Sequence, residues 1–109
     1  MKFGTKAIHA GIEPDTATGA IMTPIYQTST FIQDGVGNHK GYQYSRTQNP
    51  TRDVLQKNLA ALENGKFGAV FSSGIAAIDC VIKMLKPGDE VVATNDLYGG
   101  SYRIFKTIF

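Results

Sequence analysis

Short apolar runs alternate with helix-like stretches in residues 49–109, and this order limits the fold more than any other feature. The runs 67–71 and 90–94 have the apolar character of strands covered on both faces of a parallel sheet. Apolar residues recur about one turn apart before, between and after these runs, as in helices that each bury one face. The order helix, strand, helix, strand, helix predicts an α/β domain with right-handed crossovers.

The ends of the predicted helices carry recognisable signals. Asn49 offers a capping side chain and Pro50 suits a first-turn position, so a helix is predicted to begin there and to stop at Asn64-Gly65. A second helix is predicted over Ala76–Lys86, followed by Pro87-Gly88 turn chemistry. A third is predicted over Ser101–Phe109, and its apolar residues run on without a C-cap signal.

Residues 1–43 show neither helical nor sustained strand periodicity and are predicted to form an extended arm and loop. Their apolar residues flank Pro24, which favours extended backbone, and residues 34–41 are predicted to form a mobile loop. Such an arm cannot bury its apolar groups against itself, so it is expected to lie on another surface, including that of a partner subunit. Residues 44–109 are predicted to be the start of an incomplete α/β domain, since two strands leave open sheet edges. The chain is therefore expected to be the N-terminal piece of a longer protein.

Composition excludes several classes of function. The chain is 42% hydrophobic and has a formal charge of +2 with its charges scattered, so neither nucleic acid nor a membrane is an expected partner. A single cysteine, Cys80, rules out an internal disulfide framework and is predicted to be a small buried hydrophobe in its helix. The N-terminus lacks a secretory signal, which predicts a cytoplasmic location. His9 and His39 have no neighbours at metal-ligand spacing, so no metal is predicted.

Two segments are candidates for binding an anion. In the turn Ser73-Gly74-Ile75, between a predicted strand and helix, exposed N–H groups and the helix dipole would attract phosphate. The alternative is an ordinary turn with a serine cap. In Tyr42–Arg46, the side chains of Tyr44 and Arg46 point to the same side if the backbone is extended, and together they could clamp a phosphate. The alternative is a polar surface strand.

A third candidate is Tyr98, at the carboxyl end of a predicted strand, where open α/β sheets bind ligands. Its ring could stack on a flat cofactor. The alternative is a ring packed in the core with its hydroxyl in water. Gly99-Gly100 is interpreted as a turn.

Four strings together give the chain a specific resemblance to the transsulfuration enzymes. It resembles the N-terminal quarter or so of cystathionine gamma-synthases, cystathionine gamma- and beta-lyases and methionine gamma-lyases, which use pyridoxal 5′-phosphate (PLP). The strings, in the order and spacing of that family, are Pro24–Phe31, Tyr44–Arg52, Ser72–Ile78 and Tyr98–Arg103. The resemblance implies the first part of the large PLP domain of a fold-type I, aspartate aminotransferase-like transferase, preceded by an N-terminal arm.

The resemblance also implies roles for individual residues. The turn Ser73-Gly74-Ile75 matches positions that hold the cofactor phosphate through backbone N–H groups, although many relatives have Met at the place of Ile75. Tyr44-Ser45-Arg46 matches the segment that reaches into the site of a neighbouring subunit and binds the phosphate there. Tyr98 matches the catalytic tyrosine that stacks on the pyridine ring, and Arg103 resembles an arginine near the distal end of the substrate.

The implied enzyme acts on a small amino-acid substrate and is a homo-oligomer, a dimer of dimers in its full-length form. The resemblance implies that the family's Schiff-base lysine lies beyond this chain, and none of Lys57, Lys66, Lys83 and Lys86 falls in the family's lysine motif. The chain alone is therefore expected to be inactive. The alternative is a non-catalytic phosphate-binding or subunit-interaction module. Methionine gamma-lyases usually have Cys at the position of Gly100, which disfavours that activity. Thr47 replaces an arginine of some synthases, which weakly favours a cystathionine gamma-lyase.

Overall fold

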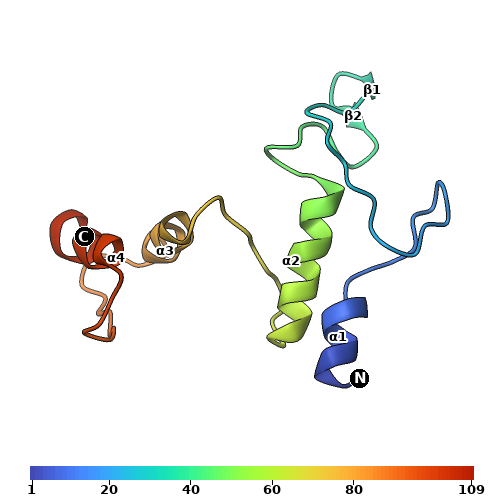
Figure 1. Ribbon diagram of the computed structural model, residues 1–109. Coiled ribbons are helices and arrows are strands. Elements are labelled where there is room, and N and C mark those ends of the chain that lie inside the picture. Colours follow the sequence, from blue (N-terminus) through green and yellow to red (C-terminus); the bar gives the residue numbers. More distant parts are fainter. The chain divides into compact units, whose positions relative to one another are not determined.

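The computed structural model describes residues 1–109, which form two compact units, Met1–Val70 and Phe71–Phe109 (Figure 1). The elements of the first unit are α1 (Phe3–His9), β1 (Gln33–Gly35), β2 (Asn38–His39) and α2 (Pro50–Leu62). Those of the second are α3 (Gly74–Ile82), α4 (Gly99–Arg103) and the π-helix η1 (Ile104–Ile108). None of these helices has the length and apolar character needed to cross a membrane.

Helix α2 begins and ends where the sequence predicts. The Thr51 N–H donates to the side-chain oxygen of Asn49 over 2.9 Å, and Pro50 occupies the first turn, where its missing N–H costs nothing. At the other end Asn64 adopts a φ of 53°, in the left-handed region, and the Gly65 N–H donates to the Ala60 carbonyl over 2.7 Å. The stop signal is thus confirmed, but Asn64 rather than Gly65 provides the left-handed residue.

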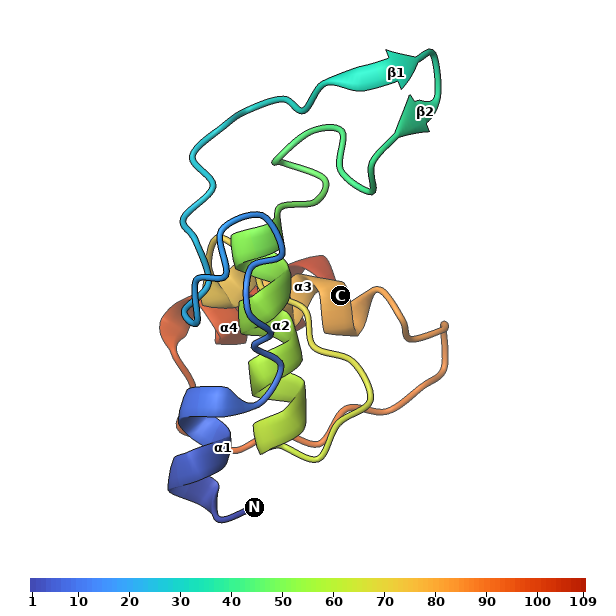
Figure 2. The ribbon, with the colours of Figure 1, turned by 90° about the vertical axis from the view of Figure 1, so that its right-hand side faces the viewer.

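Helix α1 is an element that the sequence analysis missed, because residues 1–43 were predicted to contain no helix. Both views show it beside α2 (Figures 1 and 2). The Asn58 amide of α2 donates to the carbonyls of Lys6, Ala7 and Ala10 over 3.2, 3.3 and 2.8 Å. Since α1 has no buried residue, these hydrogen bonds rather than an apolar face hold its C-terminal end, and periodicity gave no signal for it.

The predicted mobile loop at residues 34–41 contains most of a short antiparallel hairpin. Strands β1 and β2 pair with Gln33 opposite His39, and the turn between them includes Gly37 at a φ of 75° (Figure 2). This φ favours glycine, since residues with a Cβ are strained there. A further bridge joins Thr30 to Tyr44, so the chain returns antiparallel to itself before α2 begins.

The two predicted strands at 67–71 and 90–94 are absent from the structure. The only strands are β1 and β2, and both apolar runs lack ladder partners. Phe67 is 84% exposed and Val92 98% exposed, so neither run is covered on both faces. An apolar run becomes a strand only when neighbouring strands satisfy its backbone groups, and no such neighbour is present in the chain.

The helices of the second unit differ in extent from their predictions. Helix α3 begins at Gly74 and ends at Ile82, and Cys80 is exposed on it, which contradicts the prediction of a buried thiol. The predicted helix over 101–109 is present as α4 followed by the wider turn of η1, where the Phe109 N–H donates to the Ile104 carbonyl. Ile82 is the only buried apolar residue in this unit.

Candidate functional site

Tyr44 and Arg46 lie against each other in the first unit. The Arg46 guanidinium donates to the Tyr44 hydroxyl over 2.6 Å, and its central carbon lies 5.0 Å from the centre of the Tyr44 ring. The predicted pairing is present, but the predicted extended backbone is wrong. Residues 45–47 form a turn in which the N–H groups of Thr47 and Gln48 both donate to the Tyr44 carbonyl over 3.0 Å.

This turn is attached to α2 by two side chains that the sequence analysis did not assign to the site. The Arg52 guanidinium donates to the carbonyls of Ser45 (3.1 Å), Arg46 (3.3 Å) and Thr47 (2.5 Å). The Asn49 amide donates to the Ser45 hydroxyl over 3.0 Å while its oxygen caps α2. The proline and cap at the start of α2 marked this region of the sequence, but no pattern indicated that Arg52 turns back onto the preceding loop.

Hydrogen bonds hold both the backbone and the side chain of Ser45. Its N–H donates to the Ser29 carbonyl over 2.9 Å, and its hydroxyl donates to the Thr28 carbonyl while accepting from Asn49. A hydroxyl has one proton, so both donors of Ser45 are already used within the chain. This arrangement favours a bracing role for Ser45 over the predicted contact with the cofactor.

In the second unit, the predicted phosphate turn forms the N-terminus of α3. The Ser73 hydroxyl accepts from the Ala76 N–H over 3.1 Å, so the serine cap is present. The N–H groups of Gly74 and Ile75 have no acceptor within the chain, and a Cβ built on Gly74 would meet nothing within 4 Å. The turn therefore presents two free donors to open space at the positive end of a helix, which is the donor set that a phosphate needs.

Tyr98 precedes α4 and is 74% exposed, so its ring does not pack in a core. A Cβ added to Gly100 would lie 2.6 Å from Cε1 of Tyr98 and 3.1 Å from Cδ1 of Ile75. Tyr98 and Ile75, the second residue of α3, therefore both lie close to Gly100. Arg103 lies on the same short helix and is exposed, with no hydrogen bond that ties its side chain down.

The predicted site residues thus fall in two different units of the chain. Tyr44, Ser45 and Arg46 lie in the unit Met1–Val70. The other predicted residues belong to the unit Phe71–Phe109, and they are Ser73, Gly74, Ile75, Tyr98 and Arg103. No group of three or more His, Cys, Asp or Glu side chains could hold a metal ion.

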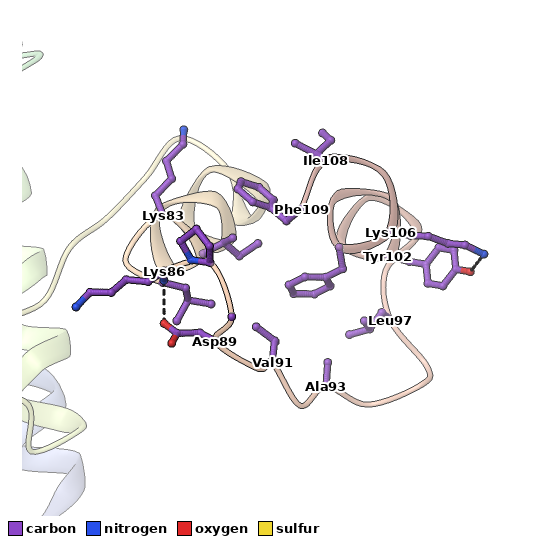
Figure 3. Close-up of a pocket in the computed structure, with 15 residues that line it drawn as sticks. Lys83, Lys86, Asp89, Val91, Ala93, Leu97, Tyr102, Lys106, Ile108 and Phe109 are labelled. Carbon is purple, nitrogen blue, oxygen red and sulfur yellow. Dashed lines mark hydrogen bonds between the residues drawn. The ribbon is translucent and has the colours of Figure 1, made fainter.

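A large apolar hollow in the second unit is a separate feature (Figure 3). Its volume is about 860 Å³, and α3, the segment after it and η1 line it with side chains such as Ile82, Val91 and Phe105. Polar pairs are at its edge, including the Lys86 N–H donating to Asp89 over 2.8 Å. None of the predicted site residues lines this hollow, so it is not the candidate site.

Tyr42 connects the loop before the turn to α2. Its hydroxyl donates to the Asp53 carboxylate over 3.1 Å, and its ring centre lies 5.5 Å from that of Phe31. Burial, and then the hydrogen bond and charge of Asp53, raise the pKa of the Tyr42 phenol above its ordinary value of 10.0. Tyr42 therefore stays neutral and supports the loop that carries Tyr44.

Comparisons with known proteins identify relatives over nearly the whole chain. Residues 4–109 match the family described as Cys/Met metabolism PLP-dependent enzyme. The chain is 56% identical over 106 residues to a probable cystathionine gamma-synthase of Herpetosiphon aurantiacus, covering 97% of this chain and 33% of that protein. The crystal structure of metB from Corynebacterium glutamicum is similar with a TM-score of 0.88 at 49% identity, covering 99% of this chain and 29% of that one.

A lyase is also among the similar structures. Cystathionine gamma-lyase from Lactobacillus plantarum, complexed with L-serine, has a TM-score of 0.85 at 45% identity, covering 99% of this chain and 28% of that one. The chain thus spans about a third or less of the length of these relatives.

Proposed function

The chain belongs to the Cys/Met metabolism family of PLP-dependent enzymes, and we propose that it is part of an enzyme that acts on the sulfur-containing amino acids of transsulfuration. It is the N-terminal part of an enzyme of the cystathionine gamma-synthase or gamma-lyase type, which uses PLP. Its fold is the first part of the α/β domain of those enzymes. In the complete enzyme, the apolar runs 67–71 and 90–94 would become strands, because the rest of the α/β domain would supply the partner strands that they lack here.

The residues of the chain fit the phosphate of PLP. The observation that carries this proposal is the pair of free N–H donors of Gly74 and Ile75 at the start of α3, with open space before them. Arg46, paired with Tyr44 and exposed, supplies the positive charge that a phosphate dianion needs. When bound, PLP withdraws electrons from the substrate α-carbon so that a group at the β- or γ-carbon can leave or be replaced.

The chain's own side chains bind and orient in this proposal. The exposed ring of Tyr98 offers a flat face for a pyridine ring, and its hydroxyl offers a proton donor and acceptor near the substrate amine. The Tyr44 hydroxyl accepts from Arg46 and so fixes the direction of the guanidinium. Arg103 offers a free cation for a negatively charged distal group of the substrate.

The site is proposed to be shared between subunits of a homo-oligomer, a dimer of dimers. Tyr44 and Arg46 of one subunit would serve the neighbour, while Gly74, Ile75 and Tyr98 serve their own subunit. Exposed apolar side chains of the predicted arm, such as Ile21, Ile25 and Ile32 at 74, 78 and 81% exposure, support a subunit contact by residues 1–43. The same side chains favour the second candidate, a subunit-interaction module. A cytoplasmic location stays a prediction from the sequence.

Reduction with borohydride tests the proposal, because it traps PLP on a lysine. The complete protein that contains residues 1–109 should give a lysine-specific adduct and cleave or form cystathionine. The 109-residue chain should give neither, because the family's cofactor lysine has no match in it. Pyridoxal without its phosphate is the control, and it should label the complete protein far less. Turnover by the 109-residue chain, or equal labelling with and without the phosphate, would contradict the proposal.

Mixing the 109-residue chain with a full-length relative tests the second candidate. Stable co-assembly with unaltered turnover of the relative would support an interaction module. Precipitation of the chain alone, or recovery of the relative free of it, would remove this candidate.

A further inference from the structure

Arg52 makes more hydrogen bonds to the 44–47 turn than any other side chain. It extends from the first turn of α2 and donates to the carbonyls of three successive residues, Ser45, Arg46 and Thr47. A guanidinium carries five N–H donors in a rigid planar fork, so one side chain can satisfy all three acceptors. No carboxylate lies within ion-pair distance of Arg52, and the only salt bridge in the chain is that of Lys83 with Asp79.

These hydrogen bonds are important because few others hold the 44–47 turn. Its internal bonds are those of Thr47 and Gln48 to the Tyr44 carbonyl. On the side of the arm, Ser45 is bonded to Ser29 and Thr28. Arg52 alone binds the carbonyls of Arg46 and Thr47 from α2. Holding the Arg46 carbonyl restricts the backbone ψ angle of Arg46, on which the rotamers of its side chain depend.

The charge of Arg52 adds a second effect. Three carbonyl dipoles converge on its guanidinium and stabilise its positive charge by hydrogen bonding rather than by an ion pair. Arg52 therefore does not need to contact an anion itself. Its side chain is used inside the protein, whereas that of Arg46 is exposed and free to bind one.

We propose that Arg52 is a positioning residue, which holds the 44–47 turn so that Arg46 and Tyr44 are preorganised for the phosphate of the cofactor. This inference rests on the proposed function of Arg46 and Tyr44. Preorganisation strengthens binding because the ordering of the turn is completed before the phosphate arrives. Arg52 acts through Arg46, so its removal should weaken PLP binding only where Arg46 is present.

Arg52→Met tests the proposal in the complete protein, since methionine keeps the apolar stem and removes the donors. Lys57→Met is the matched control, because Lys57 lies on the same helix and carries the same charge, and its side chain makes no hydrogen bond within the chain. The first readout is the dissociation constant of PLP, measured from the absorbance of the bound cofactor. The second is the amide hydrogen exchange of residues 44–48 in the cofactor-free protein.

Arg52→Met should raise the dissociation constant about tenfold and speed the exchange of residues 44–48, and Lys57→Met should change neither. Arg52→Lys should recover only part of the loss, because an ammonium cannot reach three carbonyls as a planar fork does. In an Arg46→Met background, Arg52→Met should add less than about twofold, since the two substitutions interrupt one chain of contacts.

Two results would overturn the positioning role of Arg52 while leaving the proposed function of Arg46 intact. One is exchange and PLP affinity of Arg52→Met equal to those of Lys57→Met. The other is full multiplication of the Arg46→Met and Arg52→Met effects, which would mean that Arg52 acts independently of Arg46. If Arg46→Met leaves the PLP dissociation constant unchanged, the proposed function of Arg46 fails, and the positioning role toward the phosphate fails with it. Faster exchange of residues 44–48 in Arg52→Met would then show a brace of the turn without a ligand.

Discussion

The two units of the chain differ in how their backbone groups are satisfied. In residues 1–70, side chains of α2 reach back to carbonyls far along the sequence, as Asn58 does to Ala10 and Thr51 to Pro24. In residues 71–109, nearly every hydrogen bond joins residues within about one helical turn, such as Lys83 to Asp79. The first unit is therefore held by its own polar contacts, whereas the second has helices around an open apolar hollow.

This difference shows which parts of an α/β domain can form from local sequence. Caps and loop contacts need only the residues within reach, so α2 and the 44–47 turn are complete within the chain. A parallel sheet needs several strands at once, and the runs 67–71 and 90–94 have no partner here. The predicted site residues follow the same division, since a hydrogen bond to Tyr44 holds the Arg46 side chain, whereas the exposed Tyr98 side chain makes no hydrogen bond.

The largest expected effect in the first unit is that of Asn49→Ala. Asn49 is 9% exposed, caps α2 and donates to Tyr26 and Ser45, so alanine leaves several partners unsatisfied. We expect a loss of about 3 kcal/mol from the free energy of opening of α2, measured by native-state hydrogen exchange in the complete protein. Asn95→Ala is the control, because Asn95 is exposed and makes no side-chain hydrogen bond. A loss below about 1 kcal/mol would show that the polar contacts do not hold this unit.

Gly68→Ala tests the close packing at the end of the same unit. A Cβ at Gly68 would lie 2.4 Å from the Gln56 carbonyl oxygen, a backbone atom of α2 that cannot rotate away. The expected cost is about 2 kcal/mol in the same exchange measurement. Gly4→Ala is the matched control, since nothing lies within 4 Å of its Cβ and alanine favours helix α1. Equal effects of the two substitutions would contradict the close contact.

Ser73→Ala probes the second unit with a purely local change. The Ser73 hydroxyl caps α3, and its loss should reduce the free energy of opening of that helix by about 1 kcal/mol. Gly74→Ala, one residue later, should leave stability within about 0.5 kcal/mol because its Cβ meets open space. The same Gly74→Ala protein should bind PLP more weakly, since the new methyl lies beside the free N–H groups. Unchanged PLP affinity would separate this turn from the cofactor.

The smallest effect concerns the titration of Tyr42. Its pKa is raised in the folded protein, so its contribution to stability is fully present below pH 10 and is lost as pH rises through the folded pKa. Absorbance at about 295 nm, where tyrosinate absorbs, should show one phenol that ionises at a higher pH than the others. Asp53→Asn should lower the pKa of this phenol. A Tyr42 pKa at or below 10.0 would show that this part of the first unit is open to water.

Much of the local structure could be predicted from the sequence, and the failures have physical causes. The start of α2 at Asn49 and the serine cap of α3 depend on neighbouring residues, so pattern was enough. Helix α1 was missed because Asn58, about fifty residues away in sequence, holds its carbonyls. The strand predictions assumed partners that the chain does not contain.

The candidate site shows the same limit. The pairing of Tyr44 with Arg46 was predicted, but it arises from a turn rather than from an extended segment. The roles of Arg52 and Ser45 within that turn depend on contacts with α2 and the arm, which spacing alone does not reveal. Family resemblance predicted which residues bind the cofactor, and the contacts show that Arg52 and Ser45 hold the turn.

In the proposed enzyme, Arg46 of one subunit and Tyr98 of its neighbour complete one cofactor site. Complete proteins carrying Arg46→Met or Tyr98→Leu should each have little activity as pure oligomers. After equal mixing and reassembly, each hybrid pair contains one site with both residues intact, so activity should return to about one quarter of the unsubstituted value. Activity of the mixture no greater than the mean of the two pure variants would contradict the shared site.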